Sequence, residues 1–207
     1  MADQHLPVQE IERLSAAIDS GDPSRAMPAL AGLRAVAAEQ AIPLLLLGLQ
    51  QETFMIRSLS CAGLGYKQSE AGWAALAQAL QHDDDPNVRA EAANALVSYG
   101  PERAWPLVRE AFEANSHWLL RCSILSALAE LPDLPRDWLL ELALMAVADP
   151  DGTVRVGGAE ILGRLVREGS QPSSSPAISA EARAALGQLQ HDSDHRVVAA
   201  VLNGLRP

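Results

Sequence analysis

The sequence predicts an all-α protein, a right-handed α-solenoid (α-α superhelix) of about six helix pairs. Apolar residues make up 48% of the 207 residues and aromatic residues only 4%, and the most abundant residues, Ala and Leu, are strong helix formers. A short motif recurs along the chain at intervals of about one helix pair. Within and between its copies, apolar residues follow the spacing of amphipathic helices.

The motif is clearest at residues 85–96, which read Asp-Pro-Asn-Val-Arg-Ala-Glu-Ala-Ala-Asn-Ala-Leu. An aspartate at the start can accept hydrogen bonds from the free N–H groups of a first helical turn, and an adjacent Pro or Gly suits a helix start. We therefore expect each copy to form a short helix, named a motif helix below. The copies begin at offsets of 31, 32, 32, 34 and 43 residues, at Asp22, Thr53, Asp85, His117, Asp151 and Asp194.

A second amphipathic segment precedes each motif helix and predicts the first helix of a pair. One pair cannot bury both of its apolar stripes alone, so neighbouring pairs must stack, and we expect the motif helices to line the inner, concave face. The six segments are Val8 to Ile18, Ile42 to Leu49, Glu70 to Leu80, Glu102 to Phe112, Trp138 to Ala148 and Glu181 to Leu189.

The next-to-last position of the motif is small in five of its six copies. Because small residues let helices approach closely, we expect tight packing at this position. Glycine in a helix costs about 1 kcal/mol relative to alanine, so packing should compensate for it. The six residues are Gly32, Gly63, Ala95, Ala127, Ile161 and Gly204.

The composition changes at residues 169–175, which read Gly-Ser-Gln-Pro-Ser-Ser-Ser and are followed by Pro176. This composition is typical of a flexible linker. We expect five helix pairs over residues 1–168, a linker over 169–178 and a terminal sixth pair over 179–207, within one continuous solenoid domain.

The charge balance excludes several classes of partner. Sixteen basic and 26 acidic residues give a net charge of −10, so no basic field exists to hold nucleic acid or an anionic membrane. Two cysteines cannot form a disulfide framework. The beginning of the chain lacks signal-peptide features, and no apolar run approaches the ~20 residues that cross a bilayer. We expect a cytoplasmic protein with no membrane insertion.

The motif and its spacing resemble a HEAT repeat of the short bacterial kind and, more narrowly, the repeats of the cyanobacterial bilin lyase E/F family (PBS lyase HEAT-like repeats). Residues 85–96 and 151–162 carry this resemblance most clearly. Residues 116–128, Ser-His-Trp-Leu-Leu-Arg-Cys-Ser-Ile-Leu-Ser-Ala-Leu, are similar to a segment of the phycobilisome-degradation, NblB-like members of that family. The resemblance implies a cyanobacterial protein that docks phycobiliproteins or other photosynthetic clients.

Four arginines occupy one motif position on successive motif helices: Arg57, Arg89, Arg121 and Arg155. Such a row could receive carboxylates, such as bilin propionates or an acidic client helix, by bidentate pairing. The structural alternative is that each arginine binds the capping aspartate or a loop carbonyl of a neighbouring pair. The terminal copies carry Ala26 and Val198 instead, which fits a role at internal junctions.

Phe54 and Trp118 stand at the first turn of their motif helices, where residues 85–96 have Pro86. A first-turn position is rarely deeply buried, so both aromatic side chains should be partly exposed. With His117 and Arg121 nearby, Trp118 has the composition of an interface hot spot. The alternative is that Trp118 only covers the preceding loop.

The remaining tryptophans and the cysteines favour structural roles. Three tryptophans recur periodically in the first helices: Trp73, Trp105 and Trp138. This recurrence favours a role in the core between repeats, and stacking on a bilin is the alternative. Cys61 and Cys122 occupy different motif positions of apolar helices, which predicts that both are buried and have no functional role. In lyases of the resembled type the thiol that joins the bilin belongs to the client.

The histidines argue against iron and other metals. Some HEAT-repeat proteins bind two irons through His-Glu dipeptides and hydroxylate a substrate, but none of the five histidines here precedes Glu. His191 and His195 have ligand-like spacing, yet they straddle an expected turn without an evident third ligand. Asp83-Asp84-Asp85 is interpreted as a loop that leads to a helix cap.

We therefore expect a non-catalytic docking or scaffold protein that binds a photosynthetic client on the motif helices, without a metal or a resident cofactor. The alternatives are a bilin lyase or lyase subunit, with a phycobilin as transient ligand, and a general HEAT adaptor. The expected surface comprises Phe54, Arg57, Arg89, His117, Trp118, Arg121 and Arg155.

Overall fold

The computed structural model describes residues 4–114, 117–169 and 175–206, which hold twelve α-helices and two 3-10 helices. The first helices of the pairs are α1 (Val8–Asp19), α3 (Ala38–Gly48), α5 (Glu70–His82), α7 (Pro101–Glu113), α9 (Arg136–Val147) and α11 (Pro176–Gln188). The motif helices are α2 (Pro23–Gly32), α4 (Phe54–Tyr66), α6 (Pro86–Val97), α8 (Trp118–Ala129), α10 (Gly152–Glu168) and α12 (His195–Gly204). The predicted all-α fold of helix pairs is confirmed. None of the described helices is long and apolar enough to cross a membrane.

The motif helices begin where the sequence predicts. The side chains of four aspartates accept a backbone N–H two residues further on, at 2.8–2.9 Å: Asp22, Asp85, Asp151 and Asp194. His117 caps α8 in the same way, since its Nδ1 accepts the N–H of Leu119 at 3.3 Å. Thr53 differs, because its hydroxyl donates to the carbonyl of Gly21 in the preceding pair, at 3.2 Å. Each cap satisfies an otherwise free N–H group of the first turn.

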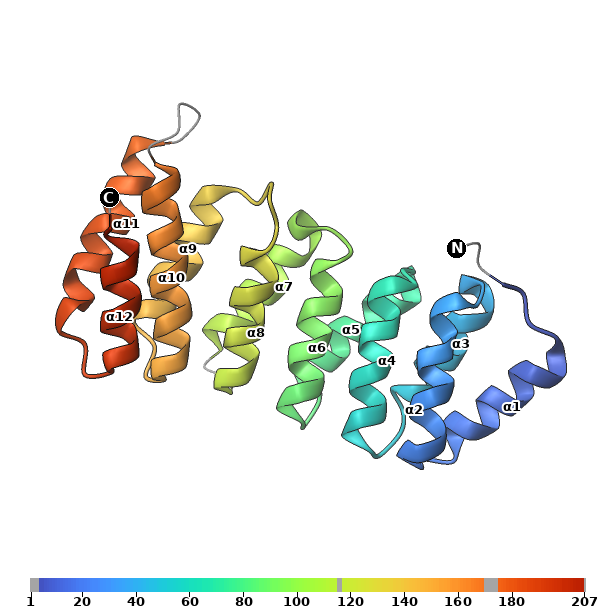
Figure 1. Ribbon diagram of the computed structural model, residues 1–207. Coiled ribbons are helices and arrows are strands. Elements are labelled where there is room, and N and C mark those ends of the chain that lie inside the picture. The colour runs from blue at the N-terminus through green and yellow to red at the C-terminus, as the bar shows by residue number, and fades with distance from the viewer. Residues whose placement is uncertain (1–3, 115–116, 170–174, 207) are drawn as a thin grey trace. The chain divides into compact units, whose positions relative to one another are not determined.

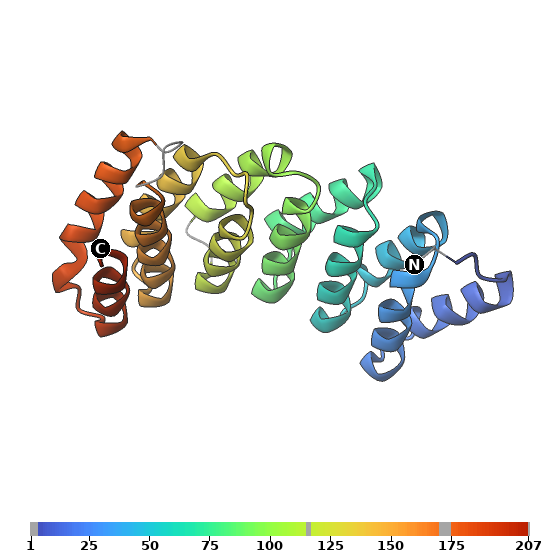
Figure 2. The same cartoon turned by 45° about the horizontal axis from the view of Figure 1, so that its top comes forward.

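The chain forms two compact units, Met1–Ala111 and Phe112–Pro207, and each is described by itself. In the N-terminal unit, α4 packs against α2 on one side and α6 on the other, while α1, α3 and α5 form a second layer (Figures 1 and 2). The apolar stripe of α6 faces inward, since Val88, Ala92 and Leu96 are fully buried. The N-terminal segment joins this unit through Gln4, which exchanges backbone hydrogen bonds with Ala35 and Ala37.

The C-terminal unit repeats this layering. Helix α10 packs against the motif helices α8 and α12 and against the first helices α9 and α11 (Figure 1). Within each unit the helix pairs therefore stack on their neighbours, as expected for a chain of repeats.

The small motif position is tightly packed in some pairs and open in one. A Cβ built on Gly63 would lie 2.3 Å from Leu45 Cδ2, and one on Gly204 would lie 2.8 Å from the Cα of Gly163 on α10. These two glycines allow the predicted close approach. Gly32 does not, because a Cβ there would meet no atom of another described element within 4 Å. The packing explanation is therefore wrong for Gly32, which is exposed at the end of α2.

The predicted linker coincides only partly with the structure. Residues 170–174 of the stretch 169–178 lie outside the described residues. Helix α11 already begins at Pro176, earlier than the predicted Glu181, because proline with its fixed φ is well suited to the first helical position. Helix α10 continues to Glu168, beyond the motif's last residue at 162.

Candidate functional site

The arginine row joins successive helix pairs. In the N-terminal unit, Arg57 Nε and Nη2 donate to the carboxylate of Asp83 at 2.8 and 2.9 Å. Its Nη1 donates to the carbonyls of Gln51 and Glu52, in the loop before its own helix. Arg57 thus connects the loop of its own pair to the loop of the next pair.

The C-terminal unit contains two equivalent connections. Arg155 Nε and Nη2 donate to Asp192, both at 2.9 Å, and its Nη1 donates to the carbonyls of Asp149 and Pro150. Arg121 pairs with Asp149, with Nε–Oδ2 at 2.5 Å and Nη2–Oδ1 at 3.0 Å. Arg121 is only 5% exposed, so it does not lie on the surface where it was expected. Arg121 can be buried because the carboxylate of Asp149 neutralises its charge and accepts a hydrogen bond from Nη2.

The acceptor in each connection stands two residues before the cap. Asp83, Asp149 and Asp192 each also accept the backbone N–H of the capping aspartate, at 2.8–2.9 Å. The predicted bonding between neighbouring pairs is confirmed, but the carboxylate is not the capping one. The signal for these acceptors in the sequence is an Asp-x-Asp pattern at 83–85, 149–151 and 192–194.

Electrostatics favour the ionised forms of the Arg57–Asp83 and Arg155–Asp192 pairs. Hydrogen bonds to Asp192 raise the pKa of Arg155, and the same bonds lower the pKa of Asp192. Burial alone would raise the pKa of Asp83, but the hydrogen bonds from Arg57 and from the Asp85 N–H lower it below its ordinary value.

Arg89 makes a different contact. Its Nε donates to the carbonyl of Leu80 at 2.9 Å, within its own helix pair. The arginine side chains thus serve the packing of pairs in this structure. The part of Arg57, Arg89 and Arg155 in client binding stays a prediction.

The two first-turn aromatic residues are partly exposed, as predicted. Phe54 is 39% exposed at the start of α4, beside Met55, which is 40% exposed. Trp118 is 42% exposed at the start of α8, with its ring centroid 5.6 Å from that of His117. Phe54 belongs to the N-terminal unit and Trp118 to the C-terminal unit. Helices α4 and α8 thus each present an accessible aromatic side chain at a position where the repeat does not require one.

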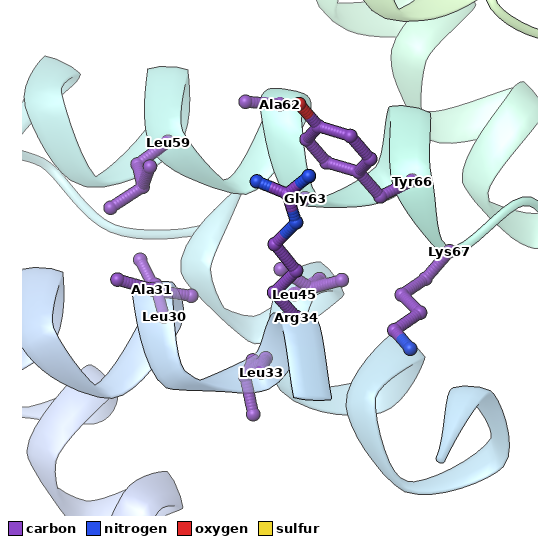
Figure 3. Close-up of a pocket in the computed structure, with 10 residues that line it drawn as sticks. All are labelled: Leu30, Ala31, Leu33, Arg34, Leu45, Leu59, Ala62, Gly63, Tyr66 and Lys67. Atoms are coloured by element: carbon purple, nitrogen blue, oxygen red, sulfur yellow. The ribbon is translucent and has the colours of Figure 1, made fainter. Parts of the chain in front are cut away.

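A pocket between α2 and α4 was not predicted. Its volume is about 210 Å³. In Figure 3, Arg34 extends from η1 (Leu33–Ala35) toward α4, where its guanidinium carbon lies 4.5 Å from the centroid of the Tyr66 ring. The pocket is lined by Leu30, Ala31, Leu33, Arg34, Leu45, Leu59, Ala62, Gly63, Tyr66 and Lys67. The sequence does not indicate this pocket, because Arg34 and Tyr66 occupy no shared motif position.

The equivalent groove of the C-terminal unit, between α8 and α10, has a different character. It measures about 300 Å³, and Glu160, Arg164 and Arg167 contribute to its walls. Arg164 is held in place by bonds to Glu168 and to the carbonyl of Ala129. The lining of the α2–α4 pocket is therefore not repeated in the α8–α10 groove.

The other tryptophans are mainly packing residues. Trp105 is 9% exposed. Trp73 is half-buried, with Tyr99 edge-on at 5.5 Å and the Arg103 guanidinium 4.0 Å above its ring. Trp138 is half-buried as well. The predicted role in the core is confirmed for Trp105, whereas Trp73 and Trp138 lie at its margin.

The thiols are shielded and the histidines are dispersed. Burial raises the pKa of Cys61 to about 12, and it also raises the pKa of the half-buried Cys122. Among the described residues, no group of three His, Cys, Asp or Glu side chains could hold a metal. Asp83 and Asp85, interpreted as part of a loop that leads to a helix cap, bind Arg57 and the first turn of α6.

Comparison with known proteins identifies the repeat. A family model for HEAT repeats matches residues 42–129, and no curated protein sequence matches the chain. The YibA protein of Escherichia coli has a similar structure, with a TM-score of 0.66 and 16% identity over 97% of this chain and 70% of its own. An engineered protein has a TM-score of 0.54 and 18% identity over 95% of both chains.

The complex of CpcE and CpcF of the phycocyanin lyase from Nostoc is also similar, at a TM-score of 0.41 and 20% identity over 97% of this chain and 100% of the other. At this TM-score the likeness does not bear on function. The match to the HEAT-repeat model covers helices that form stacked pairs within the units of this structure, from α3 to α8.

Proposed function

We propose that this protein is a non-catalytic docking protein that binds a photosynthetic client, such as a phycobiliprotein, through its motif helices. The observation that carries the proposal is the exposure of Phe54 and Trp118 at the first turns of α4 and α8. Partly exposed aromatic side chains beside polar neighbours are typical of interface hot spots. Stacked helix pairs also offer extended binding surfaces.

The nature of the client is inferred from the sequence. Residues 116–128 resemble the phycobilisome-degradation members of the bilin lyase E/F family, and Trp118 lies within this segment. The residue that the resemblance singles out is thus also one that the structure exposes.

The state of the thiols argues against chemistry that uses a cysteine of this chain as the nucleophile. A thiolate is the nucleophilic form of cysteine, and a pKa of about 12 keeps Cys61 protonated at neutral pH. A lyase that uses the client's cysteine remains the alternative function.

The test measures binding of purified phycocyanin to the full chain and to a Phe54→Ser/Trp118→Ser double variant. We expect saturable binding that the double variant weakens at least tenfold. The matched control is Val8→Ser/Leu202→Ser, which removes two apolar side chains that are 73% and 58% exposed outside the first turns of the motif helices. Equal loss in both variants, or no binding by the wild type, would contradict the proposal.

The alternatives give different results in the same preparation. A bilin lyase should change the absorbance of added phycocyanobilin or transfer it to apo-phycocyanin. A general HEAT adaptor should bind neither phycocyanin nor bilin. Arg121→Ala is unsuitable for this test, since it would leave the buried carboxylate of Asp149 unpaired.

A further inference from the structure

The α2–α4 pocket is too small for a cofactor and well suited to one side chain. Its volume of about 210 Å³ lies below the roughly 300–1,000 Å³ of most small-molecule sites. Leu30, Leu33 and Leu45 form a buried floor. A pocket of this kind can take a single large apolar side chain, which is how anchor residues of protein interfaces are bound.

The exposed rim of the pocket carries a positive charge, that of Arg34, in an acidic protein. The chain has a net charge of −10, yet the ionisable residues that line this pocket are Arg34, Tyr66 and Lys67, and no lining residue is Asp or Glu. Lys67 is only 8% exposed, so Arg34 is the cation of this pocket that a partner can reach. The local charge therefore favours an acidic partner and disfavours a basic one.

Arg34 is placed to receive a carboxylate. Its guanidinium stacks on the Tyr66 ring, and Tyr66 is 64% exposed, so the stacked pair faces solvent. In the described part of the chain no carboxylate pairs with Arg34, in contrast to Arg57, Arg121 and Arg155. Stacking fixes the plane of the guanidinium and leaves its N–H edge for a bidentate acceptor.

We propose that the α2–α4 pocket binds a segment of a partner protein in which a large apolar side chain lies next to an Asp or Glu. The apolar side chain enters between α2 and α4, and the neighbouring carboxylate pairs with Arg34. This inference rests on the proposed docking function and adds the chemistry that the docked segment must have. The α8–α10 groove lacks this character, because a glutamate contributes to its wall and Arg164 is already bonded.

The probe is a displayed library of random peptides, selected on the immobilised full chain. We expect enrichment of peptides with Leu, Phe, Trp or Met within two positions of Asp or Glu. For a synthetic enriched peptide, replacing its acidic residue by the amide should weaken binding about fivefold, the effect of one exposed ion pair.

Two variants test the pocket directly. Ala31→Trp places an indole in the pocket mouth, and it should abolish peptide binding. Arg34→Gln should weaken binding about fivefold and make it independent of the acidic residue. The matched controls are Ala71→Trp on α5 and Arg25→Gln on α2, both at exposed positions away from the pocket, and they should bind like the wild type. Far-ultraviolet circular dichroism and thermal unfolding confirm that each variant is folded.

The inference is overturned if no peptide is enriched, if the enriched peptides lack acidic residues, or if Ala31→Trp leaves binding unchanged. Failure of the two proposals can be told apart. If phycocyanin binding depends on Phe54 and Trp118 but is unchanged in the Ala31 and Arg34 variants, the docking function stands and the proposal for the pocket is wrong. Selection of the expected peptides without phycocyanin binding retains the pocket and removes the photosynthetic client.

Discussion

Gly32 and Gly63 occupy the same motif position but should respond to alanine in opposite directions. A Cβ on Gly32 meets no atom of another described element within 4 Å, whereas one on Gly63 lies 2.3, 3.2 and 3.3 Å from Leu45 Cδ2, Cδ1 and Cγ. Leu45 is fully buried and lines the α2–α4 pocket, so its side chain can relieve the clash only by shifting into that pocket. An added Cβ therefore meets no neighbouring atom at Gly32, whereas at Gly63 it clashes with Leu45.

The magnitudes follow from two opposing effects. Replacing glycine by alanine in a helix stabilises by about 0.5–1 kcal/mol, and forcing a buried side chain out of its packed position costs about 1–3 kcal/mol. Gly32→Ala should thus raise the free energy of unfolding by about 0.5–1 kcal/mol, while Gly63→Ala should lower it by about 1–2 kcal/mol. Urea denaturation followed by circular dichroism measures both values. Equal effects of the two substitutions, in either direction, would refute the packing assigned to this position.

Three further predictions concern the ion pairs and the thiols. A double-mutant cycle of Arg57→Gln and Asp83→Asn should give a coupling free energy of about 1–2 kcal/mol, as expected for a part-buried bidentate pair; additive effects would show that the pair contributes nothing. The pKa of Asp192 is held below its ordinary value of 3.8 by Arg155, so its contribution to stability is complete above that value and is lost as the pH falls through the native pKa. Unfolding measured across this acidic range should therefore show a smaller decline in Asp192→Asn than in the wild type, and an identical decline would contradict the pairing. Ellman's reagent on the folded protein should label Cys122 before Cys61, because Cys61 is fully buried with a pKa of about 12; the reverse order would contradict the burial.

The helix pairs could be predicted from the sequence because their signals are local. Asp22, Asp85, Asp151 and Asp194 cap the helices that they were expected to cap, since an N-cap needs only its own first turn. The exposure of Phe54 and Trp118 follows from the same register.

What could not be predicted depends on contacts between pairs. The aspartates that accept from the arginine row lie in loops of neighbouring helix pairs, so their role depends on how the pairs stack. The Asp-x-Asp pattern is the one local signal that indicates them. The α2–α4 pocket requires Arg34 and Tyr66 to meet across two helices, which no repeat position encodes. For Gly32 the motif position predicts a close contact with a neighbouring helix, but the structure shows no such contact.

The central claim, that a client docks on the motif helices, is tested most directly by hydrogen–deuterium exchange of the full chain with and without phycocyanin. The account predicts slower exchange in the first turns of α4 and α8, around Phe54 and Trp118, and unchanged exchange in the first helices α3, α5 and α9. Protection confined to those first helices, or the absence of any protection at saturating phycocyanin, would contradict it.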